Sequence, residues 1–251
     1  VVQQEPEVSK VNDVALNAIH LRDCRQSLFE RLLNKYRNDP DVVYMLTKQG
    51  RMHRDIASFS NYAFYNNLLD VVPLTHQQID LPHVGSSDNG IDNILSTRRL
   101  VFLHADLPEA SASDKVNQVE ADIIAATVLR IYDIEKDNFD PDETIGIIVP
   151  YRNQIATVRN TIDRSGIKPL HDITIDTVER FQGSQRKYIV YGFTVQKRYQ
   201  LKFLTNNVFT DMDGCIIDRK LNVALTRAKE HLIIVGNTEI LSNNSIFRQL
   251  I

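Results

Sequence analysis

The sequence is poor in the residues that build disulfide scaffolds and metal centres. Its two cysteines, Cys24 and Cys215, lie far apart and form no CxxC pair. This spacing argues against a disulfide framework or a cysteine-based zinc site and fits a reducing compartment, so we expect both to be buried structural residues. The seven histidines show no HxH or HxxxH spacing, and the sequence therefore predicts no metal site.

Long hydrophobic stretches are also missing. No apolar run approaches the roughly 20 residues of a membrane span. The first residues, VVQQEPEVSK, lack the basic region followed by an apolar core that marks a signal peptide. A cytoplasmic protein without a membrane partner is therefore expected, and the start without methionine favours a piece of a larger protein.

The composition that is present fits a folded protein with an uneven charge. Hydrophobic residues make up 43% of the 251 positions, enough for the core of one large domain or two small ones. The net charge is −3, but residues 176–231 carry ten Lys and Arg against six Asp and Glu. This positive stretch is compatible with a surface that faces phosphate or nucleic acid on an otherwise acidic protein.

Hydrophobic spacing is irregular in the first hundred residues. A helical stripe predicts a helix over 25–37, VVYML predicts a strand over 42–46, and the apolar positions of 51–69 predict one or two helices. Residues 71–96 show no sustained period and predict a loop or insertion.

The later residues alternate between apolar strands and amphipathic helices. Strands are predicted at 99–104, 145–150, 172–176, 187–195 and 231–236, and helices at 115–133, 152–164 and 218–228. This alternation predicts an α/β fold of three layers, a mainly parallel sheet with helices on both faces, and functional loops at the carboxyl ends of the strands.

Three polar loops are expected to converge on one edge of this sheet: PYRNQ, TVERFQGSQRK and DRKLNVALTRAK. In the second loop, Gly183 permits a tight turn, and Gln182, Gln185 and Arg186 supply hydrogen-bond donors around it. A glycine turn with polar neighbours is more often an ordinary loop than a phosphate site, so this loop alone does not decide the function.

The third loop contains a short helix with several cations. Asp218 is placed to cap its N-terminus. Its buried face is expected to comprise Leu221, Ala224, Leu225 and Ala228. Lys220 and Arg227 are seven positions apart and should share the flank beside this face, where an arginine can be held and still reach an anion. An ordinary solvated helix is the alternative.

Five separated segments occur in an order that is typical of one enzyme family. IGIIVPYRNQ, TVERFQGSQ and RKLNVALTRAK resemble motifs IV, V and VI of superfamily 1 helicases of the nonsense-mediated-decay type. LTKQGRMHRDIASFSNYAFY is similar to the QYRMHP...F...FY segment of that family, and SLFERLL to the helix before it. The resemblance runs from near Val1 to about Asn237 and implies a RecA-like fold of the P-loop NTPase type.

In that family two RecA-like domains sandwich ATP with Mg²⁺, and this chain resembles the second of them. The sequence contains no GxxxxGK[ST], and no acidic metal-binding strand end precedes the recognisable motifs. The resemblance therefore implies one second RecA-like domain over 1–251, with 1–40 as a leading segment after the domain junction. The phosphate cradle and the Mg²⁺ ligands are expected on the missing first domain, and this chain alone should be inactive.

The matching positions imply roles in ATP hydrolysis. Arg227 in ALTRAK matches the arginine finger that stabilises charge on the transferring phosphoryl group, and Arg51 in GRMH matches a second phosphate-sensing arginine. Tyr151 in PYR matches the aromatic residue that stacks on the base, and Gly183 with Gln185 match the loop that reaches ribose and phosphate. Simple packing of Tyr151 and an ordinary ion pair of Arg51 are the alternatives.

Other matching positions imply contact with nucleic acid. Thr177 matches a motif V residue on the nucleic-acid backbone, and Arg180 lies in the same positively charged stretch. The chain departs from the family at Gly50, Arg54, Gln185 and Lys187, where Tyr, Pro, Glu and Asp are usual. Gln185 can still hydrogen-bond to a hydroxyl but brings no charge.

The sequence thus predicts the C-terminal half of an ATP-dependent DNA or RNA helicase that translocates on a single strand. The alternative is a non-catalytic RecA-like module that binds nucleic acid or a protein partner. An intact GxxxxGK[ST] upstream of Val1 would favour the enzyme.

Overall fold

The computed structural model describes residues 13–19, 21, 27–81, 89–109, 113–205, 208–210 and 216–251. The chain separates into two compact units, residues 1–46 and 47–251. Cys24 and Cys215, for which burial was expected, lie outside the described residues. Within the described residues, no helix is both long enough and apolar enough to cross a membrane.

The first unit contains two helices, α1 (Val14–Ala18) and α2 (Leu28–Tyr36). The Asp13 side chain caps α1 by accepting a hydrogen bond from the Leu16 N–H. Helix α2 confirms the helix predicted over 25–37. The strand predicted over 42–46 is wrong. Pairing begins only at Lys48, which lies opposite Asp70, so the apolar run before it belongs to no β-ladder of the described residues.

The second unit is built on a five-stranded sheet in which every neighbouring pair is parallel. In spatial order its strands are β3 (Leu100–His104), β9 (Ala228–Gly236), β6 (Arg186–Gly192), β4 (Ile145–Ile148) and β5 (Thr174–Asp176). All five confirm predicted strands. Two small ladders accompany the sheet: β1 (Lys48–Gln49) is parallel to β2 (Asp70–Val71), and β7 (Val208–Thr210) is antiparallel to β8 (Ile216–Asp218).

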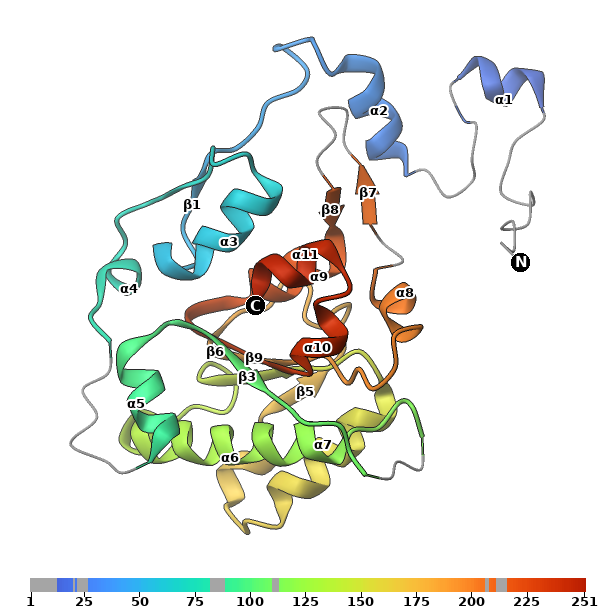
Figure 1. Ribbon diagram of the computed structural model, residues 1–251. Helices are drawn as coiled ribbons and strands as arrows, with labels where there is room; N and C mark the ends of the chain where they lie inside the picture. Colours follow the sequence, from blue (N-terminus) through green and yellow to red (C-terminus); the bar gives the residue numbers. More distant parts are fainter. Residues whose placement is uncertain are drawn as a thin grey trace. The chain divides into compact units, whose positions relative to one another are not determined.

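Helices cover both faces of the sheet (Figure 1). One face carries α6 (Gln118–Glu135) and α7 (Arg152–Asp163), and the other carries α3 (Arg54–Phe64), α9 (Arg219–Leu225), α10 (Thr238–Leu241) and α11 (Ser245–Leu250). Alternate residues of one strand supply the two cores, as Leu232 does on one face and Ile233 on the other. These three layers confirm the predicted RecA-like α/β fold.

The remaining helical elements are short. They are α4 (Thr75–Gln78), α5 (Gly90–Thr97), α8 (Gln200–Leu204) and the 3₁₀ turns η2 (Lys136–Asn138) and η3 (Lys168–His171). The prediction of a loop over 71–96 is corrected by α4 and α5. Helix α5 is capped by Asn89, and its buried Asp92 pairs with Arg130 of α6 at 2.6 Å. This tertiary contact selects a helix that is too short to show a hydrophobic period in the sequence.

Candidate functional site

The predicted site residues divide between the two edges of the sheet. All five strands run in the same direction, so residues that precede a strand lie at its amino edge and residues that follow lie at its carboxyl edge. Gln185 directly precedes β6 and Arg227 directly precedes β9, whereas Tyr151 follows β4 and Thr177 follows β5. The expectation that the three loops converge on one edge is therefore wrong.

The segment 177–185 explains this division. It leaves β5 at the carboxyl edge and reaches the amino edge, where β6 begins. On the way, Val178 and Phe181 are buried in the core between the sheet and its covering helices. The sequence already indicated that the site residues lie at two edges, because ALTRAK precedes its strand whereas PYRNQ follows its strand.

Two guanidinium groups meet around Thr226 at the amino edge. The Arg51 Nη1 donates to the Thr226 carbonyl oxygen at 3.1 Å, and the Arg51 Nε donates to Gln185 Oε1 at 3.1 Å. The Arg227 Nη2 donates to Thr226 Oγ1 at 3.2 Å, and the Arg227 Nε donates to the Val223 carbonyl oxygen at 2.9 Å. We call Arg51 and Arg227 the arginine pair, and its hydrogen-bond acceptors are all neutral.

The charge of the arginine pair has no carboxylate partner among the described residues. Neither Arg51 nor Arg227 forms an ion pair within the part of the chain that the structure describes. Only 9% of Arg227 is exposed, and burial, followed by the positive charge of Arg51, lowers the pKa of its guanidinium. Two like charges held close together fit an anion with several oxygen atoms, such as a phosphate chain.

Gly183 lies in the turn beside this pair. Its φ of 92° is in the left-handed region that favours glycine, which confirms the predicted tight turn. No atom lies within 4 Å of a Cβ added there, so the backbone conformation requires the glycine, and crowding does not. The carbonyl oxygen of the neighbouring Ser184 accepts a hydrogen bond of 3.4 Å from Arg227 Nη1. The structure therefore brings Gly183, Gln185, Arg51 and Arg227 together.

Helix α9 ends just before Arg227 and accepts two of its hydrogen bonds, at the Val223 and Ala224 carbonyl oxygens. As predicted, Asp218 caps the helix by accepting from the Leu221 N–H at 3.0 Å. The predicted apolar face is buried: Leu221, Ala224, Leu225 and Ala228. The helix ends at Leu225, so the expectation that Lys220 and Arg227 share a helical flank is wrong. Lys220 instead pairs with Glu179 at 2.9 Å, on the carboxyl-edge side.

Tyr151 lies among other aromatic residues at the carboxyl edge. It is 9% exposed, and its ring stacks on Phe203 of α8 with centroids 5.1 Å apart and an interplanar angle of 18°. A cavity of about 270 Å³ adjoins this stack and is lined by Tyr151, Phe203, Tyr199 and three polar residues. The structure does not bring Tyr151 together with Gly183 and Gln185.

Sequence reasoning missed two aromatic residues at α8, Tyr199 directly before the helix and Phe203 inside it. Tyr199 and Phe203 lie four positions apart in QKRYQLKF, a stretch with three cations, and they are 58% and 44% exposed. Aromatic residues interleaved with cations were the available signal. Of the two predicted nucleic-acid residues, Thr177 is partly buried and Arg180 is exposed.

Comparison with known proteins agrees with these features. Residues 24–239 match the AAA domain family. The chain is 29% identical over 232 residues to an uncharacterized ATP-dependent helicase of Methanocaldococcus jannaschii, a match covering 91% of this chain and 31% of that protein. It is 28% identical over 251 residues to the DNA polymerase alpha-associated DNA helicase A of Saccharomyces cerevisiae, covering 95% of this chain and 33% of that protein.

A third relative is a regulator of nonsense transcripts. The chain is 28% identical over 245 residues to a Regulator of nonsense transcripts 1 homolog of Neurospora crassa, with 90% of this chain and 19% of that protein covered. The chain thus spans a third or less of the length of each of these three relatives. It belongs to the AAA domain family and is a superfamily 1 helicase domain of the nonsense-mediated-decay type.

Proposed function

We propose that this chain is the second, C-terminal RecA-like domain of an ATP-dependent helicase, and that its amino edge completes an ATP site begun by a first RecA-like domain. The observation that carries the proposal is the arginine pair, in which Arg51 and Arg227 meet at Thr226 with neutral acceptors only. The names of the first two relatives, both helicases, support the same activity.

The surroundings of each arginine suggest distinct roles. Arg227 is buried and donates hydrogen bonds to Val223, Ser184 and Thr226, which fix its guanidinium in place. It can therefore stabilise the charge that develops on the transferring phosphoryl group without having to move itself. Arg51 is more exposed and uses only Nε and Nη1 in its hydrogen bonds. Within the described chain its Nη2 donates to no acceptor and is proposed to sense a phosphate oxygen.

The remaining nucleotide contacts are assigned to Gly183 and Gln185, which are positioned for ribose and phosphate. We leave Tyr151 out of this site, because it lies at the carboxyl edge and stacks on Phe203. Among the described residues, no group of three or more His, Cys, Asp and Glu could hold a metal ion. The Mg²⁺ ligands and the phosphate cradle are therefore proposed to come from the first domain.

The carboxyl edge is proposed as the path of a single DNA or RNA strand. Thr177 follows β5 there, and Arg180 is exposed in the same loop. The exposed rings of Tyr199 and Phe203 add faces on which bases can stack, and Lys220 lies 5.5 Å from the centroid of the Phe203 ring. Cations beside aromatic faces suit a strand that is held by its backbone and not read by sequence.

The test is ATP hydrolysis by the full-length protein. Arg227→Ala should leave ATP binding nearly unchanged and lower kcat by about 10³ to 10⁵, as expected for a group that acts in the transition state. Arg248→Ala is a matched control, because the Arg248 Nε also donates to a backbone carbonyl oxygen at 2.9 Å but lies on α11. If Arg227→Ala keeps the kcat of the wild type, Arg227 is not the arginine finger. A full-length wild type that hydrolyses no ATP and lacks GxxxxGK[ST] would instead favour the non-catalytic module.

A further inference from the structure

The backbone that carries Arg51 is held by side chains and not by regular secondary structure. The N–H groups of Arg51 and Met52 donate to Gln49 Oε1 at 2.9 and 2.8 Å. The Arg51 carbonyl oxygen lies 3.0 Å from His76 Nε2, and the Met52 carbonyl oxygen accepts from Gln77 Nε2 at 2.8 Å. All four backbone polar groups of this dipeptide therefore have side-chain partners.

Two of these three side chains come from α4, in the range for which the sequence predicted only a loop. His76 and Gln77 are adjacent, and Gln77 also donates to the Gln49 carbonyl oxygen at 3.1 Å. Only 3% of Gln77 is exposed. A four-residue helix contributes little stability of its own. It can hold these contacts in place only if it is itself attached to the rest of the unit.

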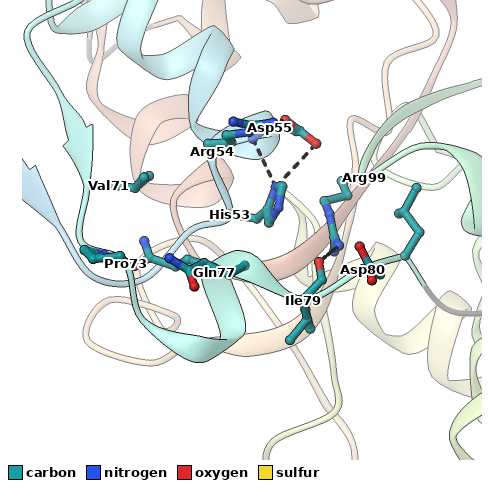
Figure 2. A pocket seen from close by; sticks show the side chains of 11 residues that line it. His53, Arg54, Asp55, Val71, Pro73, Gln77, Ile79, Asp80 and Arg99 are labelled. Atoms are coloured by element: carbon teal, nitrogen blue, oxygen red, sulfur yellow. Dashed lines mark hydrogen bonds and ion pairs between the residues drawn. The ribbon is translucent and has the colours of Figure 1, made fainter.

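Arg99 provides that attachment. It stands directly before β3, is 4% exposed, and donates to the carbonyl oxygen of Ile79 immediately after α4 and to that of Glu230 in β9 at 3.2 Å. Figure 2 shows Arg99 and Ile79 joined beside Gln77 and His53, around a cavity of about 490 Å³. The sheet thus holds α4 through Arg99, and α4 holds the backbone of Arg51.

We infer that His76 and Gln77 are positioning residues for Arg51 in ATP hydrolysis, an inference that rests on the proposed function of the arginine pair. The chain of contacts runs from Arg99 through α4 to the Arg51 backbone, and from the Arg51 side chain to Gln185 and Thr226. A guanidinium displaced by even 1 Å loses much of its effect on a reacting phosphate, so the bonds from α4 set how well Arg51 works.

The first experiment measures ATP hydrolysis by full-length protein carrying Gln77→Leu. Leucine nearly preserves the volume of the side chain and also removes Gln77 Oε1, a buried atom with no hydrogen-bond partner in the described chain, so the variant should fold. We expect kcat to fall about tenfold with little change in KM for ATP. The matched control is Gln78→Leu on the same helix, where the side chain is exposed and kcat should be unchanged.

A double-variant cycle separates positioning from general destabilisation. In an Arg51→Ala background, Gln77→Leu should cause no further loss of kcat, because the group that it positions is already gone. Equal losses in both backgrounds would overturn the inference. If Arg51→Ala itself leaves kcat unchanged, the proposed function of Arg51 fails, whereas an inactive Arg51→Ala beside a fully active Gln77→Leu removes only the positioning role.

The second measurement does not depend on ATP. Amide hydrogen exchange at Arg51 and Met52 should become about tenfold faster in Gln77→Leu and stay unchanged in Gln78→Leu. His76→Ala provides an independent variant, and His76→Gln should restore part of the loss by supplying a new N–H donor to the Arg51 carbonyl oxygen. Unchanged exchange in both Gln77→Leu and His76→Ala would show that α4 does not hold this backbone.

Discussion

Arg51 and Gln185 lie 134 positions apart in the sequence, yet the Arg51 Nε donates a hydrogen bond of 3.1 Å to Gln185 Oε1. This bond joins the segment before α3 to the loop before β6 at the amino edge of the sheet. Because Gln185 is neutral, it orients the guanidinium without neutralising it. Arg51 therefore keeps its charge for an anionic ligand.

Loss of this orientation should be visible in catalysis and not in stability. Gln185 is exposed, so Gln185→Ala should change the free energy of unfolding by no more than about 0.5 kcal/mol. The same change should lower kcat/KM for ATP in the full-length protein about tenfold, because Arg51 loses its side-chain acceptor and the ligand loses a hydrogen-bond partner. Steady-state kinetics and thermal unfolding of one preparation test both statements. A large loss of melting temperature with unchanged kcat/KM would contradict them.

Tyr151 should behave as a packing residue. Its ring is stacked on Phe203 and mostly buried, so Tyr151→Ala should lower the free energy of unfolding by about 3 kcal/mol. Tyr151→Phe keeps the stacked ring and should cost much less. KM for ATP should be the same in both variants and in the wild type. A raised KM with unchanged stability would instead favour the role on the base of ATP that the sequence resemblance implies.

A buried carboxyl group predicts a pH dependence of stability. Glu120 is fully buried on α6, and its Oε2 accepts from the Thr194 N–H at 2.7 Å. Burial raises the pKa of Glu120 to about 8, although backbone hydrogen bonds from Thr194 and Val195 act in the opposite direction. The folded protein therefore binds this proton more tightly than the unfolded chain. Its contribution to stability is complete below the ordinary pKa of 4.5 and is lost as the pH rises through about 8.

Denaturant unfolding of the chain at pH 5, 6, 7 and 8 measures this effect. Glu120 should lower the free energy of unfolding by at most about 1.4 kcal/mol per pH unit over this range, and Glu120→Gln should lack that slope. Subtracting the curve of the variant is necessary, because burial lowers the pKa of His231 to about 4 and makes its own contribution fall with decreasing pH below 6.5. Parallel curves for wild type and Glu120→Gln would contradict the prediction.

The fold was predictable because its signals are local. The strands around Ile147, Val190 and Ile233 are continuous apolar runs, and a helical period or a capping residue such as Asp218 marks the helices between them. Helices α4 and α5 were missed because they are short and depend on tertiary contacts, the first on Arg99 and the second on Arg130.

The site was only partly predictable, because which residues meet depends on whether each one precedes or follows its parallel strand. The residue types at Arg51, Gly183, Gln185 and Arg227 identified candidates that do lie together. The sequence motif that includes Tyr151 suggested the same site, but a residue that follows a parallel strand lies at the opposite edge from one that precedes it. Some hydrogen-bond acceptors of the arginine pair, such as the Thr226 carbonyl oxygen, are backbone atoms, which a pattern of residue types cannot predict.

The carboxyl edge should bind single-stranded nucleic acid mainly through phosphate contacts. Thr177 and Arg180 occupy the loop after β5, and Glu179 between them already pairs with Lys220 at 2.9 Å. Within the described residues Arg180 is the cation of this loop without an ion pair, so a nucleic-acid strand can reach it directly. Lys220 and the Thr177 side chain both contact Glu179 and would first have to leave it. Since phosphate neutralisation releases counterions, affinity should fall with salt by a log–log slope of roughly 0.7 per contacted phosphate.

A salt titration of single-strand affinity in the full-length protein tests this assignment. Arg180→Ala should weaken binding and reduce the slope by roughly 0.7, because one phosphate contact is lost. Thr177→Ala should weaken binding without changing the slope, since a hydroxyl carries no charge to exchange for a counterion. Basal ATP hydrolysis should stay unchanged in both variants, because the arginine pair lies at the other edge of the sheet. Unchanged affinity and slope in both would remove Thr177 and Arg180 from the nucleic-acid path, and reduced basal hydrolysis in either would show that the two edges are not separate in function.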